Sequence, residues 1–581
     1  NPKNIRLYGN KSGVLKEGFY EIDDLQEISI EVIGEEDQVF NDSDKVLFFG
    51  QAQKLWHQQE ASYDFTNNIY SDTTFYFLNF DLGPGKRINL SQSVEPSLPI
   101  DNYISTYDAY FSYEQDLTNL VNTGRQWMGE SFAFNPYQVF NHTSQHIDLT
   151  EPVTLVINVA ARSSVSTSFN VNNNSTNITS ISVPSISNSS EIYYKTNLIQ
   201  QDFYPQSQDL SLEITYNNMG NTSALAWLDY FSLVYRNKLV FSGNQFLFRD
   251  SRSVGLDAKS KFLINSQEAI NIWDVTDPIN AEKIEVINNN DDKEFTTSTN
   301  NLKEFILFNN SDNFYPSFIE KISNQNLHGQ SQPDYIIITH PRFLQSANRL
   351  AQYHRTVNNS EVLVATTKEI YNEFSTGSQD ITGIRNFIKM FYDRANNELD
   401  RPKNVLLFGD ASFDYKNKLS GLTNFVPTFE SEVSYSISSS FCTDDYFAVL
   451  EDLDGRWNGG ANNSIITDDL DIGIGRIPIN NVNEAESFID KIIYYNSHSL
   501  GDWKNRICFV ADDADAGWES SLITHADALA EKIDTSYNYF NIDKIYLDSY
   551  QQSIISGSQR YPDAQEDLVN LVENGAFIIN Y

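Results

Sequence analysis

The sequence is poor in cysteine and in positive charge. It has two cysteines, Cys442 and Cys508, among 581 residues. Two cysteines exclude a disulfide framework and a four-cysteine zinc site. The 40 lysines and arginines stand against 78 aspartates and glutamates, which gives a formal net charge of −38. Such a charge repels phosphate backbones, and no basic run with interleaved aromatics opposes it, so we expect no nucleic-acid partner.

Long hydrophobic runs are also missing. No stretch approaches the ~18–20 consecutive apolar residues that a membrane-spanning helix needs. The chain starts at Asn1 without an initiator methionine or a basic-then-apolar leader. We therefore expect a mature protein or an excised fragment that has no membrane-spanning helix of its own.

The first three hundred residues alternate apolar and polar side chains in short runs. Examples are Ile28–Val32, Phe75–Leu78 and Leu155–Val159, each bounded by residues that favour turns. A period of two is typical of half-buried strands. The pattern predicts two or more β-sandwich or jelly-roll units.

These strands are divided into three expected regions. We assign residues 1–92 to an amino-terminal β domain, residues 93–250 to a β-sandwich or jelly-roll domain, and residues 251–330 to a small β domain with a linker. A short helix is expected over Asp116–Thr123. The Ser- and Asn-rich segment Arg162–Ser190 fits either exposed strands or a mobile loop, and exposed strands are the favoured interpretation.

A different pattern fills residues 331–581, where apolar strands alternate with helical periods. Strands buried on both faces with helices between them predict an α/β domain with a mostly parallel sheet. The expected strands are Asp334–Thr339, Glu361–Ala365, Asn404–Phe408, Asp471–Arg476, Arg506–Ala511, Lys544–Leu547 and Ala576–Asn580. The expected helices are residues 341–351, Ile381–Asn396, Asn483–Tyr495, Trp518–Ile533 and Pro562–Glu573. Chemistry in such folds gathers just past the carboxyl ends of the strands.

The sequence contains no activated nucleophile of its own. Ser412 and Ser440 lie outside the Gly-x-Ser-x-Gly turn that exposes a catalytic serine. Cys442 is followed closely by two aspartates, and negative charge raises the pKa of a thiol. Cys508 lies in the middle of an apolar strand and is expected to be a small buried side chain.

Acidic turns offer candidate metal ligands. Asp452 and Asp454 lie in Glu451–Gly455, whose oxygens and glycine turn are of the kind that Ca²⁺ uses, although the bidentate glutamate of an EF-hand is absent. A solvated acidic turn is the favoured alternative. No histidine spacing indicates zinc, and no organic cofactor is expected.

Strand tips carry further carboxylates. Asp410 follows the strand Asn404–Phe408, where it either faces a ligand or, as we favour, caps a loop. Asp513 follows the strand Arg506–Ala511, where a carboxylate binds a cation, orients a histidine or faces water. His525 lies on the next helix, on one stripe with Leu522 and Ala526, which favours a half-buried core histidine.

Several sequence segments, taken in order, resemble segments of the gingipain-type, caspase-like cysteine peptidases, and among them of the sortases of the type IX secretion system of Bacteroidetes. They are Lys45–Gly50, Tyr70–Leu78, Asp334–Pro341, Val405–Asp410, Thr443–Phe447, Ile472–Pro478 and Asn574–Tyr581. The resemblance covers nearly the whole chain. It implies that residues 331–581 form a caspase-like α/β domain that is incomplete at its carboxyl end.

The resemblance also implies roles for particular residues. In that family, a strand ending in Asn-Tyr leads to the general-base histidine, and the nucleophilic cysteine follows the next strand, so both are expected beyond Tyr581. Asp513 matches the acid that helps to orient the histidine. Asp444, Asp445 and Leu522 are expected at the substrate-binding side. Arg-specific members have an aspartate where Leu522 stands, which argues against a preference for arginine.

The implied activity is removal of carboxy-terminal sorting domains from cargo proteins by a thiolate, followed by attachment of the cargo to anionic lipopolysaccharide. The implied partners are those cargo proteins, anionic lipopolysaccharide and the outer-membrane β-barrel PorV. The implied location is the bacterial cell surface, after export and removal of a signal peptide.

A non-catalytic protein is the alternative. A surface scaffold or glycan-binding adhesin with a degenerate caspase-like domain could stack sugars on Trp56, Trp227 or Tyr230. Isolated aromatic residues in β-sandwiches are more often part of the core, so the peptidase remains the favoured hypothesis.

Overall fold

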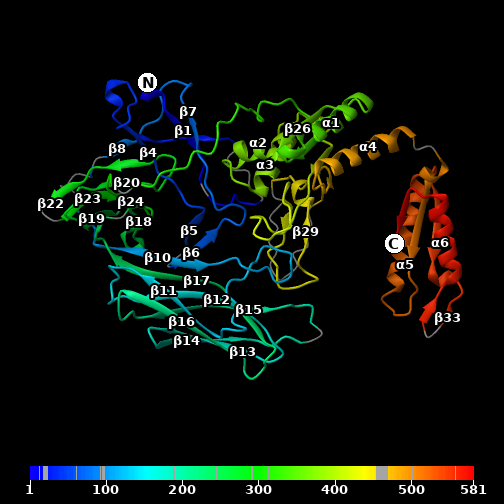
Figure 1. Cartoon of the computed structure of the whole chain (residues 1–581), viewed down its shortest axis with the longest axis horizontal. Coiled ribbons are helices and arrows are strands. Elements are labelled where there is room, and N and C mark those ends of the chain that lie inside the picture. The colour runs from blue at the N-terminus through cyan, green and yellow to red at the C-terminus, as the bar shows by residue number, and fades with distance from the viewer. Residues whose placement is uncertain are drawn as a thin grey trace. The chain divides into compact units, whose positions relative to one another are not determined.

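A computed structural model of the chain forms two compact units, Asn1–Ala485 and Glu486–Tyr581 (Figure 1). The structure describes all residues except 12, 18–23, 60–61, 92, 94–98, 188–189, 244, 290–291, 312, 453–468, 499–500 and 556–557. Each unit is described by itself.

The first unit's β region contains a sandwich of two four-stranded antiparallel sheets, at the bottom of the view in Figure 1. One sheet has the order β10 (Thr106–Glu114), β17 (Leu225–Lys238), β12 (Val153–Arg162), β15 (Lys195–Phe203). The other has the order β11 (Tyr137–Thr143), β16 (Asp209–Asn217), β13 (Thr167–Asn173), β14 (Thr176–Val183). Alternate residues of the inner strands, such as Leu155 and Ile157 of β12, are fully buried in one core shared by both sheets. The predicted sandwich is thus confirmed.

Two smaller segments test the sequence patterns. Residues 162–190 do form strands, β13 and β14, but Phe169 and Val171 of β13 are completely buried, so the segment is half core rather than exposed. The short helix expected at Asp116–Thr123 is wrong. This stretch is a turn in which Asn119 donates hydrogen bonds to the carbonyls of Thr123 and Gly124, at 3.2 and 2.9 Å.

Strands from the amino-terminal region complete two further sheets. β8 (Asn89–Ser91) pairs in parallel with β21 (Glu282–Ile284), and β9 (Asn102–Ile104) pairs in parallel with β19 (Lys259–Asn265). The other members of these sheets are β18 (Phe246–Arg249), β20 (Asn271–Asp274), β24 (Glu304–Phe308), β22 (Ile287–Asn289) and β23 (Asp292–Ser298). Residues on both sides of the predicted domain boundaries therefore share sheets, and the boundaries stay a prediction.

The first ninety residues contribute short pieces around this β region. β1 (Arg6–Gly9) lies between β2 (Gln26–Ile28) and β7 (Phe77–Asn79) in a small antiparallel sheet. Two antiparallel strand pairs accompany it: β3 (Glu31–Ile33) with β4 (Lys45–Leu47), and β5 (Lys54–Gln59) with β6 (Ser62–Asn67).

The α/β part of the first unit has a four-stranded parallel sheet. Its order is β26 (Val362–Thr366), β25 (Tyr335–Thr339), β27 (Asn404–Phe408), β30 (Gly473–Ile477). Its helices are α1 (Leu344–Val357), α2 (Thr367–Phe374) and α3 (Ile381–Asp393), and α4 (Val482–His498) begins at the end of the unit. A short antiparallel pair, β28 (Phe429–Glu430) and β29 (Cys442–Thr443), lies between β27 and β30 in the chain.

Local chemistry fixes these helices. α2 starts with a capping box in which Thr366 and Glu369 satisfy each other's backbone N–H groups. α3 starts where Asp380 accepts a hydrogen bond from the backbone N–H of Thr382. Every residue of α3 except the last is buried, so this helix is the centre of the α/β core.

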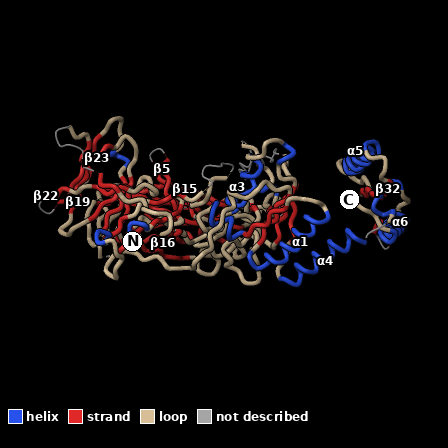
Figure 2. Tube along the Cα trace, turned by 90° about the horizontal axis from the view of Figure 1, so that it is seen from above, coloured by secondary structure: helices blue, strands red, loops and turns tan. Residues whose placement is uncertain are grey.

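The second unit has a three-stranded parallel sheet in the order β32 (Asn541–Tyr546), β31 (Arg506–Ala511), β35 (Ile578–Asn580). α5 (Ser520–Ser536) and α6 (Pro562–Asn574) cover opposite faces, as Figure 2 shows. Ala526 and Ala530 of α5 pack on Phe509, whereas Leu571 of α6 packs on the face that contains Cys508. β33 (Ser553–Ile555) and β34 (Ser558–Arg560) form a separate antiparallel pair.

The parallel α/β fold is therefore confirmed, although its strands lie in two sheets rather than one. The half-buried position expected for His525 is wrong, because the buried side of α5 is made by Ile523, Ala526, Ala530 and Ile533, which leaves His525 exposed. Leu522 is likewise exposed.

Within the first unit, one turn of the β-sandwich is inserted into the α/β part. The backbone N–H of Gly124 and the hydroxyl of Thr123 both donate to Oε2 of Glu430, at 2.8 and 3.1 Å. Gly124 has a φ of +77°, and a Cβ there would lie 2.2 Å from Oγ of Ser434. Only glycine fits at this approach.

Arg125 anchors the inserted turn. Its Nε donates to the carbonyl of Glu430 at 2.6 Å, and its Nη1 lies 2.6 Å from Oε1 of Glu17. The guanidinium also stacks over the ring of Phe429 at 4.5 Å. Burial acts to lower the pKa of Arg125, but the neighbouring oxygens of Tyr70 and Glu17 outweigh it and raise the pKa, so the guanidinium stays charged.

Arg125→Met should destabilise the first unit. The substitution leaves the Glu17 carboxylate buried without its cation, and breaking a buried pair costs on the order of 3–5 kcal/mol. Arg252→Met is the matched control, because Arg252 pairs with Glu151 at the surface, where the expected loss is below about 1 kcal/mol. Denaturant unfolding checks both variants, and equal losses would contradict the anchoring role.

Glu430 should make stability depend on pH. Burial is the main cause that raises its pKa to about 7, against about 4.3 in an unfolded chain. Between these values the folded state keeps a proton that the unfolded state releases, so this contribution is present below about pH 4.3 and is lost as the pH rises through 7.

Glu430→Gln tests this linkage, since a glutamine oxygen can accept the same two hydrogen bonds. We expect the variant to gain on the order of 3 kcal/mol relative to wild type between pH 4 and pH 8. Exposed Glu432→Gln is the control, and unfolding titrations at each pH provide the measurement. A pH-independent difference for Glu430→Gln would rule out the proton uptake.

Candidate active site

The carboxyl edge of the second unit's sheet brings strand ends together. β31 and β35 run parallel, and Phe509 pairs with Asn580, so the residues after Ala511 and after Asn580 emerge at the same edge. Asp512 and Asp513 follow β31 there, and Tyr581 follows β35. This is the edge at which parallel sheets usually place their chemistry.

Asp513 is held by two neutral donors. The hydroxyl of Tyr561 donates to its Oδ2 at 2.6 Å, and Nε2 of Gln552 donates to the same oxygen at 3.4 Å. Gln552 also donates to the Tyr561 oxygen at 2.9 Å, so the three side chains form a closed set. Within the part of the chain that the structure describes, Oδ1 of Asp513 accepts no hydrogen bond. That oxygen is available to an imidazole N–H.

Other acids surround this edge. The backbone N–H of Asp513 donates to Asp512, and that of Ala514 donates to Asp548, at 3.0 and 3.3 Å. Asp512, Asp515 and Asp548 are exposed, whereas Asp513 is half-buried. Negative charge close to a histidine stabilises its protonated form. This edge of the sheet is therefore suited to bind an imidazole and to stabilise its protonated form.

Leu522 belongs to the same unit. It lies in the first turns of α5, which follows the Asp513 loop, and 43% of its surface is exposed. Trp518, just before α5, is also exposed. Leu522 is thus accessible as an apolar contact, and its role in substrate binding stays a prediction.

Asp444 and Asp445 lie in the first unit and differ from each other. Asp444 receives two hydrogen bonds from Arg476, at 2.8 Å from Nε and 2.7 Å from Nη2. Arg476 also donates to the carbonyls of Gly409 and Val426 at 2.8 and 2.6 Å. Asp444 therefore orients Arg476 of β30, which contacts the backbone just after β27. Asp445, in contrast, is exposed. Their proposed role in substrate binding stays a prediction.

The candidate calcium ligands are only partly described. Asp452 is 88% exposed and pairs with Nζ of Lys389 at 2.9 Å, and Asp454 lies outside the described residues. Among the described residues, no group of three or more histidine, cysteine, aspartate or glutamate side chains could hold a metal ion. Calcium binding at this turn stays a prediction.

Neither cysteine is activated. Burial and the nearby carboxylates of Glu430 and Asp444 raise the pKa of Cys442. Burial raises the pKa of Cys508 to about 11. Because the thiolate is the nucleophile, both are unsuited to catalysis at neutral pH.

Asp410 and two of the three candidate sugar-stacking aromatics, Trp56 and Trp227, have structural contacts. Asp410 accepts from the Thr423 hydroxyl at 2.9 Å and its backbone caps the following loop, as favoured. Trp227 is buried, and Trp56 packs against Tyr110. Tyr230 lines a cavity, which is described below.

Residues 328–581 match the profile of peptidase family C25. The chain contains a peptidase family C25 domain. It includes both parallel sheets and the Asp513 edge, which confirms the resemblance read from the sequence.

A solved structure of dimeric latent PorU from Porphyromonas gingivalis is similar with a TM-score of 0.73 and 25% sequence identity. The match covers 85% of this chain and 47% of that one, so this chain spans about half of its length. The CBM36-1 domain of a multidomain xylanase from the hindgut metagenome of Trinervitermes trinervoides matches at 8% identity over 22% of this chain and 95% of that one, but its TM-score of 0.15 carries no argument. A comparison with curated proteins finds no match.

The sequence did not indicate the two residues that hold Asp513. Tyr561 and Gln552 were not singled out, because Tyr561 lies 48 residues from Asp513 and neither residue belongs to a recognisable motif.

Across the described residues, no helix is both long and apolar enough to cross a membrane.

Asp513→Asn should lower the pKa of Tyr561. The hydrogen bond to the Asp513 carboxylate is the main cause that raises the pKa of Tyr561 to about 12, and removal of the negative charge should return it toward 10. NMR of ¹³Cζ-labelled tyrosine measures the titration, with Tyr561→Phe to assign the signal. Asp512→Asn is the control. Titration of Tyr561 near 10 in the wild type would show that the contact is absent in solution.

Proposed function

We propose that this chain forms the β domains and much of the catalytic domain of a cell-surface cysteine peptidase that acts as a type IX secretion sortase. The C25 match over residues 328–581 carries the proposal, and the similarity to latent PorU over both the β and the α/β parts supports it. In this proposal the enzyme removes carboxy-terminal sorting domains from cargo and attaches the cargo to anionic lipopolysaccharide.

The proposed mechanism assigns a role to Asp513. Its free Oδ1 accepts the N–H of a histidine supplied by residues after Tyr581, which fixes the tautomer and orientation of the imidazole. A cysteine thiolate, also from beyond Tyr581, attacks the scissile carbonyl, and the imidazolium protonates the leaving amine. The resulting thioester is then opened by an amine of lipopolysaccharide or by water.

The proposed setting is the outer surface of the outer membrane, with the β-barrel PorV as docking partner. The net charge of −38 opposes direct contact with an anionic polysaccharide. We therefore propose that Ca²⁺ bridges the protein and the polysaccharide. Chelation of calcium should then release the protein from the cell surface.

Cleavage by the natural full-length protein tests the proposal. Under reducing, calcium-containing conditions it should cut peptides that join a cargo sequence to its sorting domain, and iodoacetamide should abolish cleavage. Cys442→Ala and Cys508→Ala should both retain activity, because neither thiol is the nucleophile. Loss of activity in Cys442→Ala, with folding intact, would place the nucleophile in this chain and contradict the mechanism.

Asp513→Asn in the same protein should lower kcat/KM at least about tenfold, because the histidine loses its orienting carboxylate. Asp515→Asn, an exposed neighbour, is the matched control. Peptide kinetics over a pH range distinguish the two roles, since an orienting acid shifts the pH profile and a structural residue lowers the rate uniformly. Unchanged kinetics in Asp513→Asn would contradict its role.

A further inference from the structure

A cavity of about 360 Å³ lies within the first unit, whereas Asp513 belongs to the second. Its walls come from the end of β10, from β17, from the inserted turn and from the loop after β27. Volumes of this order are typical of small-molecule sites. Neither the C25 match nor the proposed function assigns a role to it.

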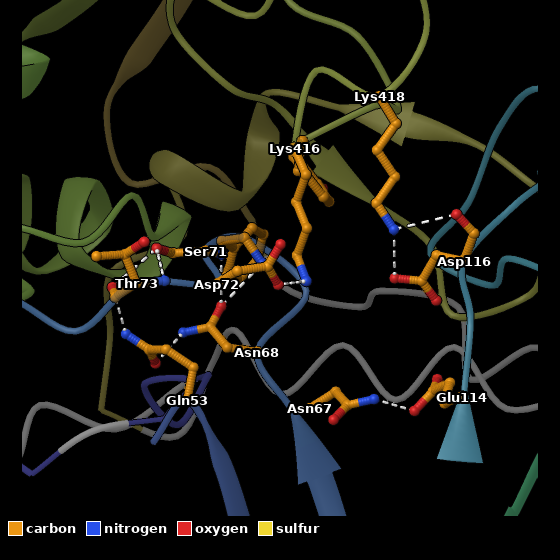
Figure 3. A network of polar contacts seen from close by, with 12 residues as sticks. Gln53, Asn67, Asn68, Ser71, Asp72, Thr73, Glu114, Asp116, Lys416 and Lys418 are labelled. Atoms are coloured by element: carbon orange, nitrogen blue, oxygen red, sulfur yellow. Dashed lines mark hydrogen bonds and ion pairs between the residues drawn. The ribbon is translucent and has the colours of Figure 1, made fainter. Parts of the chain in front are cut away.

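Each cation at this cavity already has a carboxylate partner. Lys418 pairs with Asp116 at 2.9 Å, and Lys416 pairs with Asp72 at 2.5 Å, as Figure 3 shows. Arg125 pairs with Glu17. The charge of each of these cations is therefore already balanced by one of these carboxylates.

Three other carboxylates of the same cavity form no ion pair with any residue that the structure describes. Glu114 accepts from the Asn67 amide (Figure 3). Asp229 accepts from the amides of Gln126 and Asn158 at 2.9 and 2.7 Å. Asp414 accepts from a backbone N–H, that of Leu419, at 2.6 Å. Every one of these donors is neutral.

Two of these carboxylates also keep an oxygen without a partner. Both hydrogen bonds to Asp229 go to Oδ2, and within the described chain its Oδ1 accepts none. Asp414 likewise has an unpartnered Oδ1. Asp229 is 5% exposed and Asp414 1%, so both side chains are largely withdrawn from bulk water. A buried carboxylate in this state is costly unless a cation joins it.

The backbone places Asp229 at the cavity by a β-bulge. In the pairing of β12 with β17, Asn158 faces Tyr230 and Val159 faces Leu228, so Asp229 is the extra residue. Bulges re-aim a side chain and are common at functional sites. Burial is the main cause that raises the pKa of Asp229 to about 6 and that of Glu114 to about 7.

The remaining walls suit an organic cation. Trp127 and Tyr230 both line the cavity. The Nζ of Lys418 lies 5.7 Å from the centre of the Trp127 ring, so this wall already accepts an ammonium group. The amide of Gln126 donates one N–H to Asp229 and accepts from the Tyr194 hydroxyl, and its second N–H can bind a hydroxyl group. The described residues include no cluster that could hold a metal ion.

We propose that this cavity binds a small organic ammonium ion, up to about the size of an amino sugar, with Asp229 as the principal counter-ion and Glu114 beside it. The ammonium group completes the hydrogen bonding of Asp229 Oδ1. The inference does not depend on peptidase activity.

Isothermal titration calorimetry of the folded protein tests this, with glucosamine and glucose as a matched pair of probes in phosphate buffer. The two sugars have the same shape and differ in charge, so we expect glucosamine to bind at least tenfold more tightly. Asp229→Asn should abolish the difference, because its oxygen still accepts from Gln126 and Asn158 while the charge is gone. Asp202→Asn, an exposed site on β15, should retain it.

Other results would overturn the proposal. Equal binding of the two sugars would show that charge is not recognised, binding of Ca²⁺ alone would indicate a metal site, and no binding at millimolar concentration would indicate a water-filled cavity. Thermal unfolding shows whether Asp229→Asn is folded, and we expect it to be at least as stable as wild type. If it does not fold, Glu114→Gln serves as the second variant, with the same expected loss of the glucosamine preference.

Discussion

Burial of Arg125 against Glu17 and Glu430 is the interaction on which the first unit depends. It joins three segments that are far apart in the sequence: the amino-terminal stretch, the turn between β10 and β11, and the strand pair between β27 and β30. A charged side chain can be buried at such a junction only when its partners are already in place. The junction therefore forms only when β and α/β parts are both folded, and it requires a glycine at position 124.

Buried carboxylates near this junction are satisfied in two different ways. Glu430 lies against backbone and hydroxyl donors, so its burial serves the framework. Asp229 and Asp414 line a shared cavity, and within the described part of the chain each keeps one oxygen without a hydrogen-bond partner. Because these oxygens border a cavity, a bound cation can complete their hydrogen bonding. The same contrast separates Asp444, which is engaged by Arg476, from Asp513, which keeps one oxygen free.

The two candidate sites lie in different units and use different chemistry. Asp513 is at the carboxyl end of a parallel strand, where the C25 domain can present an imidazole. The Asp229 cavity lies between a β-sandwich and the loop that follows β27, where a bulge and a domain contact create it. In the proposed function the first site serves catalysis, and the proposed cation site is independent of it.

The sequence by itself determined the local order of the α/β part. The strands Asn404–Phe408 and Arg506–Ala511 agree with β27 and β31 to the residue, because continuous apolar runs between turn signals leave one way to bury both faces. Asp513 was found because a carboxylate directly after such a strand is visible in the sequence. The low reactivity of Cys442 also followed from its acidic neighbours.

Only the tertiary structure decided which distant residues meet. The pairing of β8 with β21, the Tyr561 contact of Asp513 and the insertion of Arg125 all join residues separated by long stretches of chain, and local periodicity carries no information about them. His525 shows the same limit within one helix, since two stripes of α5 share Ala526 and Ile533, and packing against β31 selects the stripe that buries the small residues. The free oxygen of Asp229 depends on a bulge and on two amide partners from other segments, so only the folded chain could reveal it.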